Sequence, residues 1–276
     1  MFFDLLLQGQ LLWNLPLLAA LIFIGGLYVF LLQSLTKVKI HQQQPLLFFL
    51  SLAILYLIIG SPLSSLSHLS FSLHMLQLSI LYFIIPPLFL LGMPDSLLQQ
   101  FGKTSVSKKI GKFVIPPKAA LYAFGALFLM YHFPVLLTFL SQYTVVHNGY
   151  LFVLLVLSFW MWRPIAAPDL KKDGSMRKNK RYVVLSGLVL MPACLLFVFN
   201  AILGEMNNPF LTQMTANLCM SPSDLSSFNI LPSPFNTSFD QILAGILMLV
   251  MHKFGLTLTV RLRNIVPRRP EVEMVE

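Results

Sequence analysis

The sequence predicts an all-α, polytopic membrane protein with seven transmembrane helices, its N-terminus outside the cytoplasm and its C-terminus inside. Three observations predict this fold: the composition, the number of long apolar stretches, and the distribution of basic residues. The residues AVILMFWYC make up 57% of the 276-residue chain, charged residues only 11%, and the mean hydropathy is +0.77. A soluble domain carries about 25% charged residues. The composition therefore places the chain in the membrane class.

Each predicted helix is an apolar stretch long enough to cross a bilayer. A hydrocarbon core needs about 20 apolar residues in helical form, because a helix satisfies its own backbone hydrogen bonds in lipid. The expected spans are 11–35, 46–63, 69–93, 119–140, 145–162, 182–203 and 239–260. They form a single integral membrane domain over residues 1–276, with residues 261–276 as a cytoplasmic tail. No basic residue precedes the first apolar stretch, so we expect no cleaved signal peptide and a retained first helix.

The basic residues determine the predicted orientation. Lysines and arginines lie in the loops after the first, third and fifth predicted helices and in the tail, and none lies in the other loops. Lys253, in the C-terminal half of the seventh helix, can extend toward the same surface. The positive-inside rule makes that surface cytoplasmic. The excess of 19 basic over 10 acidic residues is thus a topology signal, and we expect a lipid bilayer and no nucleic acid as partner.

Three histidines are predicted to lie at one depth near the outer surface. His74 falls in the first two turns of the third predicted helix, His132 about two turns from the outer end of the fourth, and His147 at the outer start of the fifth. Imidazole binds copper and zinc, and thioether suits Cu(I). The sequence leaves two interpretations open: a metal site of these histidines, supported by Met75 and Asp240, or histidines that form ordinary interhelical hydrogen bonds.

Asp240 lies at the outer start of the seventh predicted helix and has two compatible interpretations. It suits the N-cap of that helix, where a carboxylate also favours the positive end of the helix dipole. It also suits a role beside a metal-binding histidine, whose second ring N–H it would accept. The two cysteines, Cys194 and Cys219, do not indicate a disulfide framework.

Three local patterns accompany these residues. They are Phe-Ser-Leu-His-Met-Leu-Gln at 71–77 followed by Pro-Pro-Leu-Phe-Leu-Leu-Gly-Met-Pro at 86–94, His-Phe-Pro at 132–134 with Phe-Trp-Met-Trp-Arg-Pro at 159–164, and Asp-Gln-Ile-Leu-Ala-Gly-Ile-Leu-Met at 240–248. They resemble the His-Met helix with its Pro-Pro and Gly-x-Pro exit, the His-x-Pro and Trp-Pro motifs, and the Asp-Gln-x-x-Ala-Gly-x-x-Met signature of the CtaG family of bacterial cytochrome c oxidase assembly factors. The resemblance extends over about residues 45–250.

The resemblance implies a non-enzymatic assembly factor in the bacterial cell membrane. It would serve a haem–copper cytochrome c oxidase, aid copper insertion on the outer side, and have the oxidase subunits as partners; a homo-oligomer is left open. The chain departs from the family pattern at Leu78 and Leu151, where the family is expected to carry a second histidine one turn after His74 and His147. No paired carboxylates, Ser–His–Asp set or phosphate loop is visible, so an enzyme is not indicated.

Two other functions share parts of this pattern. A small-solute or metal-ion transporter would also be a helical bundle with polar residues in the outer leaflet. No inverted repeat is visible, however, and no predicted helix carries buried charge near mid-membrane except at His252 and Lys253. A retinal-type photoreceptor shares the outside N-terminus and a lysine in the seventh helix. Lys253 lies too near the cytoplasmic end for that function, and the third helix has no carboxylate.

Overall fold

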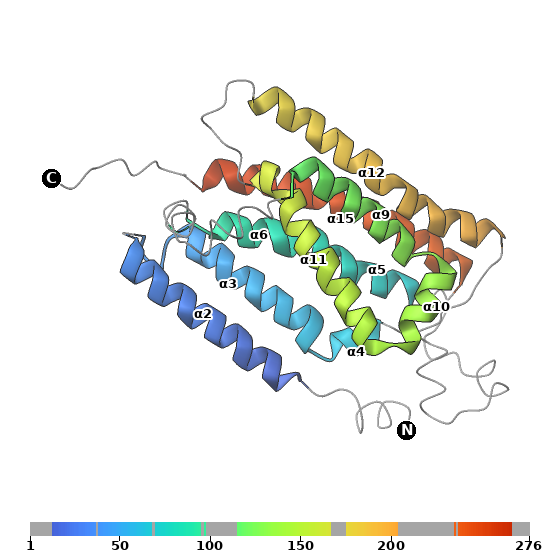
Figure 1. Cartoon of the computed structure of the whole chain (residues 1–276), viewed down its shortest axis with the longest axis horizontal. Coiled ribbons are helices and arrows are strands. Elements are labelled where there is room, and N and C mark those ends of the chain that lie inside the picture. Colours follow the sequence, from blue (N-terminus) through green and yellow to red (C-terminus); the bar gives the residue numbers. More distant parts are fainter. Residues whose placement is uncertain are drawn as a thin grey trace.

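The computed structural model describes residues 13–36, 38–67, 70–94, 97, 115–166, 175–203, 235 and 237–266. Within them the regular structure is helical (Figure 1). The helices are α2 (Leu15–Leu35), α3 (Gln43–Leu55) with the π-helix η1 (Tyr56–Gly60), α4 (Leu63–Ser67), α5 (Phe71–Ser79) with the π-helix η2 (Ile80–Ile84) and α6 (Ile85–Gly92), α9 (Pro117–Tyr131), α10 (Pro134–Gln142), α11 (Thr144–Ala166), α12 (Ser175–Leu203) and α15 (Ser238–Ile265). Cys219 and the predicted tail from 267 onward lie outside the described residues.

The secondary structure of the described residues confirms the all-helical class. The length and hydropathy of these helices give six or seven candidate spans. Among the residues that the structure describes, six helical segments are long and apolar enough to cross a membrane, and α9 with α10 passes the same test only as a bent pair. Successive segments run in alternating directions (Figure 1). Large apolar side chains on the outer faces are open to the surroundings, among them Phe23 at 71% and Phe152 at 65% exposure. Exposed apolar surface on this scale matches a lipid environment better than water.

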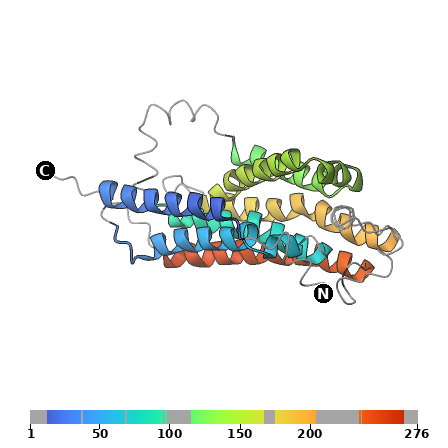
Figure 2. The ribbon, with the colours of Figure 1, turned by 90° about the horizontal axis from the view of Figure 1, so that it is seen from below.

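The segment α5–η2–α6 is the central helix of the bundle. In its most apolar window 72% of the residues are buried, against 22% for α2, which lies at the edge. Helix α15 packs along α5 and α12, α3 packs along α6, and α9 packs along α11. Figure 2 shows α9 and α11 stacked on one side of α5–α6 and α15.

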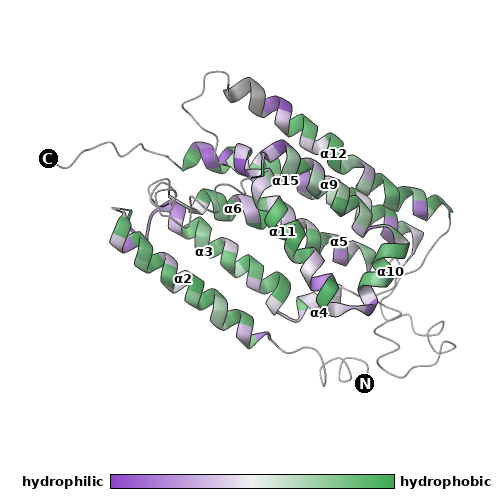
Figure 3. Cartoon of the chain, viewed as in Figure 1, coloured by the Kyte–Doolittle hydropathy of each residue, from purple (hydrophilic) through white to green (hydrophobic). Residues whose placement is uncertain are grey.

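Charge separates the two ends of the bundle. Figure 3 shows hydrophilic residues at the left-hand ends of α12 and α15. The described basic residues near helix ends at this side are Lys39, Lys118, Arg163, Lys180, Arg181, Arg261 and Arg263. The Arg263 guanidinium donates to the Ile165 carbonyl at 3.1 Å and so joins the ends of α15 and α11. Asp240, the only acidic residue in the described part of the chain, lies at the opposite end.

The Pro86–Pro87 pair explains the π-helical turn in the central helix. Proline has no N–H, so the carbonyls of Tyr82 and Phe83, four residues earlier, lose their usual helical donors. The Trp162 indole of α11 donates to the Tyr82 carbonyl at 2.9 Å. The Phe83 carbonyl faces Gly255 of α15, where a Cβ atom would overlap it. The break in the helix therefore creates contact points for two neighbouring helices.

Gly92 and Gly245, which both lie in the sequence patterns described above, also permit close backbone contacts. A Cβ on Gly92 would lie 2.5 Å from the Phe48 backbone nitrogen of α3. The Gly92 carbonyl accepts a hydrogen bond from the Tyr28 hydroxyl of α2 at 2.8 Å. A Cβ on Gly245 would lie 2.7 Å from the Cys194 carbonyl of α12. Glycine at these positions lets α6 approach α3, and α15 approach α12.

The predicted continuous span at 119–140 is broken in the structure. Helix α9 ends at Tyr131, α10 begins at Pro134, and the two axes meet at 82°. A residue before proline avoids the α conformation, and Phe133 accordingly has φ −70° and ψ 129°. With 15 residues, α9 is about 22 Å long, which is shorter than the hydrocarbon core of about 30 Å.

Candidate functional site

The predicted site residues lie at the end of the bundle opposite the basic residues. His74 is the fourth residue of α5, His147 the fourth of α11, and Asp240 the third of α15. His132 directly follows α9, whose C-terminus reaches the same end. All four side chains are buried, with exposures of 6%, 9%, 0% and 3% in that order.

Tyr131 connects two of the three histidines. Its hydroxyl lies 3.0 Å from Nε2 of His74 and 3.0 Å from Nε2 of His147. Tyr131 itself is fully buried. A phenol has one proton, so it donates to one imidazole and accepts from the other. Nε2 therefore carries a proton in one of the two histidines and has none in the other.

His132 is paired with Met75 instead. Its Nδ1 lies 2.6 Å from the Phe128 carbonyl, and its Nε2 lies 3.2 Å from the Met75 sulfur. The Phe128 carbonyl is available because the backbone N–H of His132 donates to Leu129 at the end of α9. A helix end leaves such carbonyls without intrahelical partners, and the His132 ring supplies one.

Asp240 caps a helix, but not its own. Thr237 is the N-cap of α15. The Asp240 carboxylate accepts from the backbone N–H groups of Phe71 and Ser72 at 2.9 and 3.3 Å. It also accepts from the Ser70 hydroxyl, at 2.9 and 3.1 Å to its two oxygens. These donors are at the N-terminus of α5, where the helix dipole favours an anion. The interpretation of Asp240 as the N-cap of its own helix is thus wrong, and Asp240 fixes the start of the helix that carries His74 and Met75.

The arrangement divides the predicted metal ligands into two sets. Within the described residues, no group of three or more His, Cys, Asp or Glu side chains is placed to hold a metal ion. One set is the chain His74–Tyr131–His147, and the other is the pair Met75–His132. A single copper centre of all three histidines stays a prediction.

The two positions where relatives were expected to carry further histidines are apolar here. Leu78 is 2% exposed and belongs to the main core, and Leu151 packs against that core. The Tyr82 hydroxyl donates to the Leu151 carbonyl at 3.3 Å. The layer one turn deeper than the histidines is therefore closed by leucine side chains.

Tyr131 is the site residue that the sequence interpretation missed. A signal existed, because a tyrosine inside an apolar helix usually finds a partner for its hydroxyl when it is buried. Tyr131 also directly precedes His132. Two adjacent residues at the end of α9 thus contact two adjacent residues of α5, Tyr131 with His74 and His132 with Met75.

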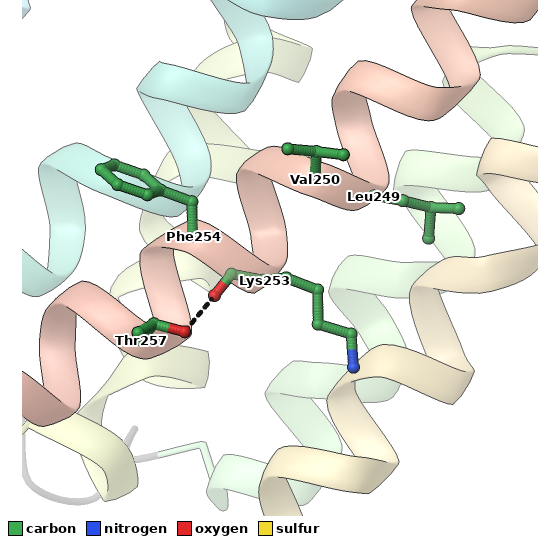
Figure 4. A pocket seen from close by; sticks show the side chains of 5 residues that line it. All are labelled: Leu249, Val250, Lys253, Phe254 and Thr257. Carbon is green, nitrogen blue, oxygen red and sulfur yellow. Dashed lines mark hydrogen bonds between the residues drawn. The ribbon is translucent and has the colours of Figure 1, made fainter.

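Lys253 lies away from this site. A shallow pocket on α15 is lined by Leu249, Val250, Lys253, Phe254 and Thr257 (Figure 4). The Lys253 side chain extends along the outside of the bundle toward α12, where a Cβ on Gly187 would be 3.7 Å from its amine. An exposed lysine on the outer face does not line an interior path, which weakens the transporter interpretation.

The fold and the site together define a polytopic helical membrane protein with a buried imidazole–phenol–thioether cluster at one end. The chain matches the family described as cytochrome c oxidase caa3 assembly factor (CtaG) over residues 26–262. It belongs to that family. Searches of the curated proteins and of the solved structures found no match to the chain.

Proposed function

We propose that this protein is a non-enzymatic assembly factor of a bacterial haem–copper cytochrome c oxidase, and that it aids copper insertion on the outer side of the cell membrane. Family membership supports the assembly role. The observation that carries the copper step is the cluster of His74, His132, His147 and Met75 at one buried end of the bundle. Imidazole and thioether are the donor types that bind copper.

The sidedness of the proposal follows from charge. The cluster lies at the end opposite the described basic residues. The positive-inside rule puts those basic residues in the cytoplasm, so the histidines face the outer leaflet. The N-terminus is then outside and the C-terminus inside. Copper would be cargo for the oxidase subunits, and the oxidase would be the partner.

A clean deletion strain tests the assembly role. We expect lower cytochrome c oxidase activity in isolated membranes while the oxidase subunits are still synthesised, with activity restored by the wild-type chain. Normal oxidase activity, in a strain with no related copy, would contradict the assembly role. The copper content of the purified oxidase tests the copper step separately. A deletion strain with low oxidase activity but fully copper-loaded oxidase would support the assembly role and contradict the copper-insertion step.

The same deletion strain distinguishes an assembly factor from a transporter. An assembly factor leaves the total copper content of intact cells unchanged, because it acts on delivery to one enzyme. A transporter alters uptake or efflux, and a copper supplement would compensate for its loss. An altered copper content in cells whose oxidase is normal would favour transport over assembly.

A further inference from the structure

We propose that Met75 and His132 form a Cu(I)-selective ligand pair that works independently of the chain His74–Tyr131–His147. This inference rests on the proposed copper role. Met75 and His132 would then be the residues that bind the metal, and Cu(I) the oxidation state that they accept.

The Phe128 carbonyl determines the position of the proton on His132. Its Nδ1 lies 2.6 Å from the Phe128 carbonyl oxygen. A carbonyl only accepts hydrogen bonds, so Nδ1 carries a proton, and in the neutral ring Nε2 then has an open lone pair. Histidines that bind metals usually donate their other ring N–H to such a group, which fixes the tautomer and the ring orientation. His132 therefore has the second-ring hydrogen bond expected of a metal ligand.

Nε2 of His132 faces the Met75 sulfur. The Met75 sulfur lies 3.2 Å away, and a thioether has no proton to donate. Two lone-pair atoms thus point at each other inside the bundle, with Met75 2% and His132 3% exposed. A cation bound by both atoms, to one side of the line that joins them, would satisfy both. The alternative is a proton on Nε2, which would place a charged imidazolium in a buried position at a large cost.

The Met75 sulfur determines the type of metal that the pair accepts. Thioether sulfur is a soft ligand and favours Cu(I), whereas harder divalent ions favour imidazole and oxygen. Metal–nitrogen bonds of about 2.0 Å and metal–sulfur bonds of about 2.3 Å in zinc sites show the scale of such contacts. The present separation of 3.2 Å is shorter than the sum of two such bonds, so one ion reaches both atoms in a bent arrangement.

His74 and His147 contact Tyr131 and are not part of this pair. Nε2 of His74 and of His147 each contacts the Tyr131 hydroxyl at 3.0 Å. A metal that used those nitrogens would have to displace the tyrosine. The Met75–His132 pair requires no such displacement.

The test measures metal affinity of the purified full-length protein in detergent, under anaerobic conditions, by competition with the Cu(I) chelator bicinchoninate. We expect Met75→Leu to weaken Cu(I) binding by more than about tenfold and to leave Zn(II) binding unchanged. Met130→Leu is the matched control, because Met130 lies on α9 next to Tyr131 but is 51% exposed; its Cu(I) affinity should equal that of the wild type.

X-ray absorption at the copper edge of the wild-type protein gives a second measurement that does not depend on a variant. We expect a sulfur neighbour at about 2.3 Å. Copper bound only by nitrogen, or an unchanged Cu(I) affinity in Met75→Leu, would overturn the pair while copper binding itself stands. A wild-type protein that binds no Cu(I) would overturn the pair and the copper step together. The oxidase activity of the deletion strain would still decide the assembly role independently.

Discussion

The rings of Tyr131 and His147 lie almost parallel, 9° apart with centroids at 5.8 Å, and the tyrosine hydroxyl is 3.0 Å from Nε2 of the histidine. The same hydroxyl reaches His74 on α5. One oxygen at the end of α9 therefore joins α5 and α11, the helices on either side of it. The helix end at Tyr131 is set by Pro134, so the position of this oxygen follows from the break between α9 and α10.

Replacing Tyr131 by phenylalanine should remove both bonds and leave two buried ring nitrogens without their oxygen. Interhelical hydrogen bonds in membranes contribute about 0.6 kcal/mol on average, and a buried group without a partner costs about 1–3 kcal/mol. We expect a lower thermal midpoint of unfolding in detergent. Tyr122→Phe is the control, since Tyr122 lies on the same helix and is 52% exposed. Equal midpoints for the two variants would show that the hydroxyl does not stabilise the bundle.

Replacing Asp240 by asparagine should loosen the start of α5. The amide keeps the shape but loses the charge and one acceptor, so the N–H groups of Phe71 and Ser72 lose part of their cap, at a cost of about 1–3 kcal/mol. Faster hydrogen exchange at residues 71–74 would report this local loss. The control is Asn148→Ala, which removes an exposed polar side chain near the start of α11. Exchange at 71–74 that is unchanged in Asp240→Asn would contradict the capping role.

The location of the helices along the chain could be predicted from the sequence. The rotation of each helix about its own axis, which decides which neighbour a side chain faces, could not. Apolar length and the side of the basic residues determine where a span begins and ends, because the bilayer sets both. These constraints placed His74, His132 and His147 at one end of the bundle, where the structure has them. Neither constraint determines which neighbour a side chain faces. The contacts of His132 with Met75, and of Asp240 with the N-terminus of α5, depend on packing between helices that are far apart in sequence.

The breaks in the helices likewise have one part that the sequence predicts and one part that depends on packing. Pro134 was visible inside the predicted span 119–140, and a proline inside a helix is compatible with either a kink or an end. The structure shows an end, with an angle of 82° that no local pattern specifies. The Pro86–Pro87 pair was likewise visible. The use of the freed Tyr82 carbonyl by Trp162 required the packed structure.

Cysteine labelling of intact cells tests the predicted orientation. In a background with Cys194 and Cys219 replaced by alanine, we expect an impermeant maleimide to modify Val145→Cys, at the start of α11 and 85% exposed. Lys180→Cys, exposed at the start of α12, should react only after the membrane is permeabilised, because the positive-inside rule puts that end in the cytoplasm. The reverse pattern would invert the topology and place the histidine cluster on the cytoplasmic side.

Trp162→Phe should destabilise the bundle because the Tyr82 carbonyl loses its indole donor in a fully buried position. We expect a loss of about 1–3 kcal/mol, seen as a lower midpoint of thermal unfolding in detergent. Trp160→Phe is the matched control from the same motif, because Trp160 is only partly buried and its ring lies 5.5 Å from the Arg163 guanidinium carbon. A Trp162→Phe midpoint equal to that of Trp160→Phe would show that the freed carbonyl needs no donor.

Gly255→Ala tests the second consequence of the proline pair. The added Cβ would overlap the Phe83 carbonyl oxygen, and that carbonyl belongs to the backbone of the central helix, so it cannot rotate away as a side chain would. Either α15 or α5–α6 must shift, and overpacking of this kind costs about 1–3 kcal/mol. Gly149→Ala is the control, because nothing lies within 4 Å of a Cβ at that helical position and alanine favours a helix over glycine by about 1 kcal/mol. Thermal unfolding in detergent should therefore show a lower midpoint for Gly255→Ala and an equal or higher one for Gly149→Ala. A Gly255→Ala midpoint at the wild-type value would mean that the approach of α15 to the broken helix is not a tight contact.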